Sequence, residues 1–310
     1  MEACHSPQQY KVTSYGTITV AITTLEAFAG MWINAFIVCV LSIGWITKKT
    51  LNSNEILLLL GCSRICSLCV SWAYALLSFI YPNYLYVHPI LQILTFSVIF
   101  FNFSNLWVSA SLCVFYCIKI ANFRNTFFIY LKVKIDRMVP WLLLGSVLSA
   151  LALGSVICTF TETVQGNNLT ITYLRNFWDT SIRMDKHFTS SFFLAGFGYA
   201  SSFMAVVSSA LFLLFSLWRH KRKMQTNSME DLNMEAHIKA MKSILSFLVM
   251  YTINFVCLIL STIYAIKNEN TMTLLIFIYL HAFPGVHSLI LIFSNPKLEK
   301  ALLRILSYVK

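Results

Sequence analysis

Charged side chains are scarce in this sequence of 310 residues. Asp, Glu, Lys and Arg together make up 11% of it, hydrophobic residues make up 58%, and the mean hydropathy is +0.71. A soluble domain is usually about one quarter charged, so this chain has too little charge to cover a water-exposed surface. The composition excludes most soluble classes, including the nucleic-acid-binding protein that a net charge of +11 would otherwise suggest.

The sequence also lacks the motifs of common enzyme and metal sites. It has no Gly-rich phosphate loop, no serine elbow with flanking glycines and no His-Glu-x-x-His motif. His281 and His287 are six residues apart, whereas a pair of ligands on one helix face is usually four apart. Cys66 and Cys69 spell Cys-x-x-Cys, but cysteine within an apolar run usually packs as a small apolar residue. We therefore predict no enzyme activity, no cofactor and no metal site.

Long apolar runs are what the sequence has instead. Seven runs reach the roughly 20 residues that a transmembrane helix needs. They cover residues 16–46, 54–81, 87–118, 138–160, 190–218, 241–266 and 272–294. The predicted fold is an all-α membrane protein, with a seven-transmembrane helix bundle and a short amphipathic C-terminal helix. We expect a single domain over 1–310, in which residues 16–294 hold the spans and loops.

The basic residues are distributed unevenly between alternate connecting segments. Of the 23 Lys and Arg residues, 17 fall in the set of segments that includes the C-terminus, and five fall in the other set. Because basic loops stay in the cytosol, we predict an extracellular N-terminus (1–15) and a cytoplasmic tail (295–310) in a multi-pass plasma-membrane protein. The sequon Asn168-Leu-Thr170 then lies in an extracellular loop, which makes Asn168 a candidate glycosylation site.

A few polar residues interrupt the apolar runs. Glu26 and Asn34 lie in the first run, Arg64 in the second, and Asn102 and Asn105 in the third. A charged side chain in a span is costly and marks a functional hypothesis. We predict an interior polar network in which Asn34 and neighbouring carbonyls hold Arg64. The alternative is interhelical hydrogen bonding without a switching role.

The C-terminal segment has the pattern of an amphipathic helix. Pro296 can end the seventh helix and start another over 297–308. Its apolar stripe consists of Leu298, Leu302, Ile305 and Leu306. We expect this helix to lie on the inner leaflet; a cytosolic protein partner is the alternative.

Several motifs in order give the chain a family resemblance. They are Glu26…Gly30…Asn34, Leu60…Ser63-Arg64, Trp107, Phe115-Tyr116-Cys-Ile-Lys119, Ser216-Leu-Trp-Arg-His220, Ala236-His237-Ile-Lys239, Phe247-Leu-Val-Met-Tyr251 and His287-Ser288 before Asn295-Pro-Lys297. The sequence resembles the type 2 taste receptors, the bitter taste receptors among G-protein-coupled receptors, over nearly its whole length. The third run ends without Asp-Arg-Tyr, and the seventh lacks Asn-Pro-x-x-Tyr, which fits this family.

The resemblance implies a cavity that opens outward and binds small bitter compounds. The implied ligand-binding residues are Val98, Asn102, Tyr251, Phe277 and Leu280. Many family members have Trp where this chain has Val98, which is a departure from the pattern. Core packing is the alternative role for each of these residues, and for Phe277 and Leu280 the two readings are nearly even.

The resemblance also implies a signalling role. The implied activation network consists of Glu26, Asn34, Arg64, Trp107, His287 and Ser288. The implied G-protein-coupling residues are Tyr116, Lys119, His220, His237 and Lys239. The expected partner is a heterotrimeric G protein of the gustducin or inhibitory type, and the lipid bilayer is the expected environment.

Two alternative functions remain open at the level of sequence. A membrane transporter would favour internal repeats, and none is evident. Another chemosensory receptor, such as an odorant receptor, would favour the Asp-Arg-Tyr motif that this chain lacks.

Overall fold

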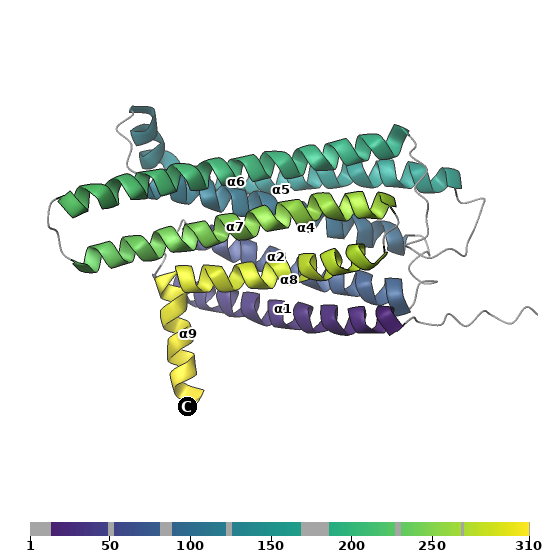
Figure 1. The fold of residues 1–310 in the computed structure, drawn as a ribbon, viewed down its shortest axis with the longest axis horizontal. Helices are drawn as coiled ribbons and strands as arrows, with labels where there is room; N and C mark the ends of the chain where they lie inside the picture. The colour runs from purple at the N-terminus through teal and green to yellow at the C-terminus, as the bar shows by residue number, and fades with distance from the viewer. Residues whose placement is uncertain are drawn as a thin grey trace, which may run out of the picture.

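The computed structural model describes residues 14–48, 53–80, 89–121, 126–168, 186–226, 231–267 and 270–309, and these residues are almost entirely helical. The helices are α1 (Ser14–Lys48), α2 (Ser53–Ile80), α4 (Ile90–Ile120), α5 (Thr126–Asn168), α6 (Lys186–Thr226), α7 (Asp231–Lys267), α8 (Asn270–Ser294) and α9 (Pro296–Val309). Seven of them, all except α9, are long and apolar enough to cross a membrane. The predicted all-α fold with seven spans is therefore confirmed (Figure 1).

Several helices are longer than their apolar runs. The fourth run was predicted over 138–160, but α5 begins at Thr126; likewise α6 continues to Thr226 and α7 begins at Asp231. Apolarity indicates the length of chain that lies in hydrocarbon, whereas helical hydrogen bonding continues into water. The exposed basic side chains of Lys132 and Arg137 therefore lie on a helix rather than in a loop.

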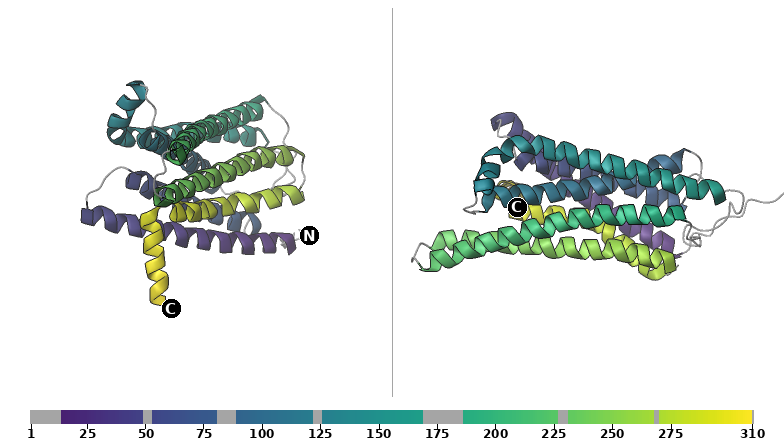
Figure 2. Two further views of the ribbon diagram at one scale, coloured as in Figure 1. Left: turned by 60° about the vertical axis from the view of Figure 1, so that its left-hand side comes forward. Right: turned by 90° about the horizontal axis from the view of Figure 1, so that it is seen from above.

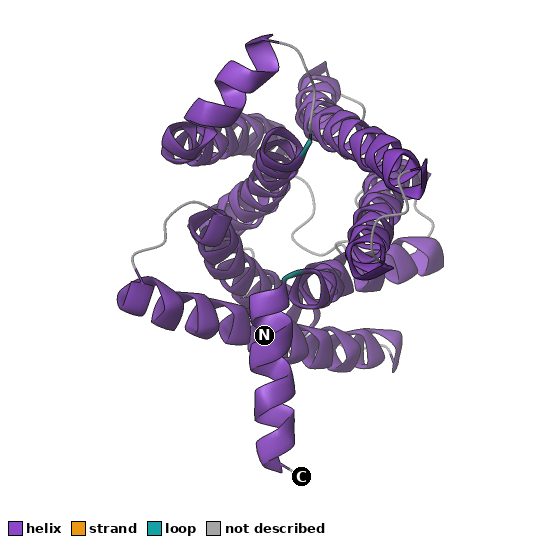
Figure 3. Ribbon diagram, turned by 90° about the vertical axis from the view of Figure 1, so that its left-hand side faces the viewer, coloured by secondary structure: helices purple, strands orange, loops and turns teal. Residues whose placement is uncertain are grey.

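The seven long helices pack side by side into one bundle. α4 packs against α2, α5 and α6, α1 packs against α2 and α8, and α7 packs against α6 and α8. Figure 3 looks along this bundle from the end where α9 lies. We call this the α9 end, and we call the opposite end, where α1 begins, the N-terminal end.

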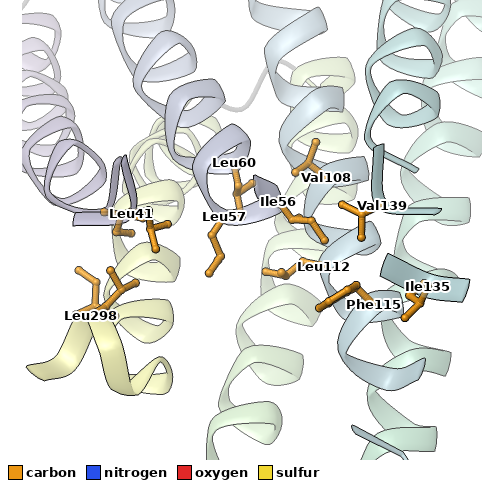
Figure 4. Close-up of a cluster of buried hydrophobic side chains, with 12 residues drawn as sticks. Leu41, Ile56, Leu57, Leu60, Val108, Leu112, Phe115, Ile135, Val139 and Leu298 are labelled. Carbon is orange, nitrogen blue, oxygen red and sulfur yellow. The ribbon is translucent and has the colours of Figure 1, made fainter. Parts of the chain in front are cut away.

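The largest buried apolar cluster lies toward the α9 end (Figure 4). It joins Leu41 of α1, Leu57 of α2, Leu112 of α4, Val139 of α5 and Leu298 of α9. Lipid chains are as apolar as these side chains, so close packing rather than removal from water holds such helices together. The cluster therefore fixes the α9 end of the bundle by shape.

The predicted C-terminal amphipathic helix is confirmed as α9. It begins at Pro296, and the Asn295 side-chain oxygen accepts a hydrogen bond from the Lys297 backbone N–H at 3.0 Å. Leu298 is fully buried against the bundle, whereas Ile305 and Leu306 are about half exposed. Figures 1 and 2 show α9 turning away from the bundle at a steep angle to α8. The exposed apolar residues are then available to a lipid surface.

α1 and α8 approach each other closely at two glycines. A Cβ atom added to Gly285 would lie 3.3 Å from the Gly30 Cα atom, and one added to Gly30 would lie 2.8 Å from a methyl carbon of Leu68. Small residues permit such close backbone approach between membrane helices. This contact fixes the register of α1 against α8.

Candidate functional site

Arg64 of α2 is buried in the bundle, with 2% of its surface exposed. Its Nη1 donates to the Ser288 hydroxyl oxygen at 2.6 Å, and its Nη2 lies 2.5 Å from His287 Nδ1. A guanidinium has only donors, so Nδ1 accepts and the His287 proton is on Nε2. In the part of the chain that the structure describes, no carboxylate contacts Arg64. Its charge is held by neutral acceptors on α8.

Ser288 connects Arg64 to α1. Its hydroxyl oxygen lies 2.7 Å from Asn34 Oδ1 and 2.8 Å from the Pro284 carbonyl oxygen, both of which are acceptors. The Asn34 side-chain N–H in turn donates to the Gly30 carbonyl at 2.8 Å. Asn34, Arg64, His287 and Ser288 thus form a hydrogen-bonded chain from α2 through α8 to α1, which we call the polar network.

The partners of Arg64 differ from the sequence expectation. Asn34 was expected to hold Arg64, but it reaches Arg64 only through Ser288. The spacing of residues within α1 and α2 cannot show that α8 packs beside them and presents two acceptors. The partners of a buried arginine depend on this tertiary arrangement.

Glu26 and Trp107 were also expected in the activation network. Among the described residues, neither side chain forms a hydrogen bond to the polar network. Glu26 Oε2 and Trp107 Nε1 are buried and without a hydrogen-bond partner among the described residues. Trp107 packs beside Phe103 and Ala150, in a cluster of α4, α5 and α6. A role for either residue in activation stays a prediction.

Tyr251 of α7 lies in an aromatic cluster, with 2% of its surface exposed. Its hydroxyl donates to the Leu106 carbonyl of α4 at 3.3 Å. Its ring centroid is 5.7 Å from that of Phe247, 6.4 Å from that of Phe283 and 6.5 Å from that of Phe203. One side chain therefore contacts α4, α6, α7 and α8.

The aromatic cluster continues into the polar network. The His287 ring lies 4.7 Å from Phe247 and 5.6 Å from Phe283, measured between centroids, and Tyr251 contacts both phenylalanines. His287 in turn accepts the hydrogen bond from Arg64. A continuous path of contacts runs from Tyr251 to Arg64.

The other four expected ligand-binding residues lie nearer the N-terminal end than Tyr251. Asn102 and Val98 are one and two turns beyond Leu106 on α4, and both are half-buried. Phe277 and Leu280 of α8 are also half-buried, and the Phe277 ring lies 4.6 Å from that of His281. Binding by these residues stays a prediction.

The expected coupling residues lie at the α9 end. Tyr116 of α4 is half-buried between two apolar clusters. Lys119 forms an exposed ion pair with Asp136 of α5 at 2.9 Å, and its Nζ lies 5.0 Å from the centre of the Phe115 ring. The remaining three residues, His220 of α6 and His237 and Lys239 of α7, lie on helices, but their side chains are outside the described set. Asn168, the candidate glycosylation site, is the last residue of α5, and its side chain is also outside the described set.

Three aromatic residues of the site were not identified from the sequence. Phe283 links Tyr251 to His287, and Phe203 stacks on Phe255 with ring centroids 4.2 Å apart. The spacing of Phe283 and His287 by four residues was a usable signal, because such residues are neighbours on a helix. No comparable signal pairs Phe203 on α6 with α7.

The sequence of this chain is similar to those of several taste receptors. A family model for "Taste receptor protein (TAS2R)" matches residues 12–310. Taste receptor type 2 member 105 of Mus musculus is 31% identical over 94% of this chain and 97% of its own length. Taste receptor type 2 member 40 of Gallus gallus is 32% identical over 95% and 96%. Taste receptor type 2 member 10 of Homo sapiens is 29% identical over 94% of each.

A solved structure supports the fold independently. Squid rhodopsin superposes with a TM-score of 0.62 at 12% sequence identity, over 98% of this chain and 88% of rhodopsin. At this identity the likeness concerns the fold, which is the seven-helix bundle.

Proposed function

The chain belongs to the bitter taste receptor family of G-protein-coupled receptors, and from this premise we propose that it detects small bitter compounds and activates a heterotrimeric G protein of the gustducin or inhibitory type. The observation that carries the proposal is the path of contacts from Tyr251 to Arg64. It connects the part of the bundle where we place the ligand with the polar network.

The proposal includes an orientation in the plasma membrane. We place the N-terminal end outside the cell. The basic residues where α5 and α7 begin, where α6 ends, and on α9 then face the cytosol, as the excess of positive charge favours. The ligand would then enter from the N-terminal end, and the G protein would bind at the α9 end.

The proposed ligand site lies between α4, α7 and α8. Asn102 supplies a polar group that can fix the orientation of a ligand, while Val98, Phe277 and Leu280 supply apolar surface. Tyr251 forms the floor, because it lies deeper than the others and its hydroxyl is tied to the α4 backbone. A mainly apolar site with few fixed polar groups tolerates ligands of varied structure.

Activation requires that an agonist bind the active arrangement of the helices better than the inactive one. A ligand resting on Tyr251 would favour one packing of the Phe247 and Phe283 rings, and those rings contact His287. A shift of His287 alters how α8 holds Arg64. The resulting movement of α7 and α8 would open the α9 end to the G protein.

The coupling surface is proposed at the ends of α4, α6 and α7. Lys119 is already exposed and held by Asp136, so exchange of this ion pair for contacts with a G protein would cost little. Tyr116, His220, His237 and Lys239 complete the proposed surface. The basic side chains there also suit the anionic inner leaflet.

The experiment is a calcium-release assay in cells that express the receptor with a chimeric G protein, screened against a panel of bitter compounds. We expect Asn102→Ala to shift the half-maximal concentration of responsive agonists by about 10-fold, the loss of about one hydrogen bond, with normal surface expression. Ser97→Ala is the matched control, because among the described residues the Ser97 hydroxyl bonds to the Ile93 carbonyl of its own helix and to no other helix. Unchanged responses to every agonist would contradict the site.

A further inference from the structure

Three titratable side chains outside the polar network, Glu26, Tyr279 and His281, have a buried atom without a hydrogen-bond partner among the described residues. Glu26 Oε2 of α1 and His281 Nδ1 of α8 are both buried and unpartnered among the described residues. His281 as a whole is 8% exposed, and Glu26 is half-buried. A buried polar group left without a partner costs about 1–3 kcal/mol, so the Glu26 and His281 side chains each need an explanation.

The glycine contact places these two residues at the same level of the bundle. α1 and α8 both run from the N-terminal end toward the α9 end, and they meet at Gly30 and Gly285. Glu26 lies four residues before Gly30, and His281 lies four residues before Gly285. Each is therefore about one helical turn from the contact, on the same side of it.

The two side chains also lie on the facing sides of their helices. Residues four apart on a helix share a face, so Glu26 follows Gly30 toward α8, and His281 follows Gly285 toward α1. α2 packs beside α8 on α1: a Cβ added to Gly30 would also meet Leu68 of α2, and the Trp72 Nε1 donates to the Thr24 hydroxyl at 3.1 Å.

We propose that Glu26 and His281 form a hydrogen-bonded pair across α1 and α8, bridged by one water molecule. A buried water needs two to four polar partners, and this site offers the Glu26 carboxyl oxygen and the His281 nitrogen. The carbonyl of Leu280 is a third candidate, because Pro284 has no N–H to donate to it. The pair has zero net charge whether its shared proton is on the carboxyl or on the ring.

The pair would act as a positioning element for α8. The His281 ring contacts Phe277, which belongs to the proposed ligand site, and His281 lies two turns from Ser288 of the polar network. A second tie between α1 and α8 at this level limits rotation of α8 about the glycine contact. This part of the inference rests on the proposed function, whereas the existence of the pair does not.

A double-mutant cycle on the purified full-length receptor in detergent tests the pair. Glu26→Leu, His281→Leu and the double variant are compared by their thermal unfolding midpoints. We expect each single variant to lower the Tm by about 2–4 °C, and the double variant to lower it by no more than either single variant. Glu26→Gln keeps a hydrogen-bonding side chain and should retain most of the wild-type Tm.

Ser104→Ala provides the matched control. Ser104 of α4 also has a buried hydroxyl without a partner among the described residues, but the main neighbours of α4 are α2, α5 and α6 rather than α1. Its effect should add to that of Glu26→Leu. Additive effects of Glu26→Leu and His281→Leu, or a Glu26→Gln variant as unstable as Glu26→Leu, would overturn the pair. Because no agonist or G protein is present, the result is independent of the proposed function.

For the positioning role, the same variants are measured for agonist-independent calcium release at matched surface expression. Both leucine variants should change agonist-independent calcium release in the same direction. The Glu26→Gln variant should keep it near the wild-type level. A basal signal that is unchanged in both leucine variants would remove the positioning role, even where the thermal cycle shows coupling.

Discussion

Arg64 shows how one buried cation can be stable without a carboxylate. Its two terminal nitrogens reach different acceptors on adjacent residues of α8, and a planar guanidinium has the fork geometry that such a pair requires. The charge is therefore coupled to the position of α8 rather than to another charge. Any rotation of α8 changes both hydrogen bonds together.

Arg64→Lys tests this geometry. A lysine ammonium cannot match the fork, so we expect loss of one of the two bonds, which is about 1.5–3 kcal/mol for a hydrogen bond to a charged group. Since the polar network is common to all agonists, the response to every agonist should weaken while their rank order stays the same. Dose–response curves at matched surface expression measure both quantities.

Arg137→Lys is the matched control. Because Arg137 is exposed on α5, we expect this substitution to be tolerated. A loss of response to only some agonists in Arg64→Lys would mean that Arg64 acts in ligand selection rather than in a shared network.

At the scale of helices, the close contact between α1 and α8 depends on two glycines, Gly30 and Gly285, which have no Cβ atom. A Cβ atom added to Gly285 would lie 3.3 Å from the Gly30 Cα, which is a backbone atom and not part of a flexible side chain. A backbone cannot rotate away, so even a methyl group would push α8 from α1. The polar network crosses the same interface one turn farther toward the α9 end.

Gly285→Ala should therefore destabilise the receptor by about 1–3 kcal/mol, the usual cost of overpacking. Gly145→Ala on α5 is the matched control, since no atom lies within 4 Å of its added Cβ, and alanine favours the helix by up to about 1 kcal/mol. Thermal unfolding of the purified receptor compares the two. An equal Tm for both variants would contradict the close-contact model.

The sequence predicted helices better than it predicted their partners. Apolar runs alone located all seven long helices, and the spacing of Leu298, Leu302, Ile305 and Leu306 located α9. Helix ends such as Thr126 of α5 were missed because polar residues continue a helix into water. The acceptors of Arg64 were missed because they depend on which helices become neighbours.

At the scale of the whole molecule, the arrangement of charge defines two different ends. Most basic residues of α5, α6, α7 and α9 lie at the α9 end, where the ion pair of Lys119 with Asp136 also lies. The N-terminal end has few of them. This asymmetry is the physical basis for the proposed orientation.

The orientation can be measured with epitope tags. A tag at the N-terminus should bind antibody on intact cells, and a tag after Lys310 should bind only after permeabilisation. Doubly tagged receptors serve as their own control for expression. Labelling of the C-terminal tag on intact cells would contradict the predicted topology and would move the coupling surface to the other side of the membrane.

The Ser288 hydroxyl has one hydrogen atom and two acceptors at nearly equal distances, Asn34 Oδ1 at 2.7 Å and the Pro284 carbonyl at 2.8 Å. A hydroxyl donates one normal hydrogen bond at a time. It can therefore donate either to Asn34 of α1 or to Pro284 within α8, while its oxygen accepts from Arg64 in both cases. Rotation of one O–H bond thus makes or breaks the hydrogen bond between α1 and α8, while their packing at Gly30 and Gly285 is unchanged.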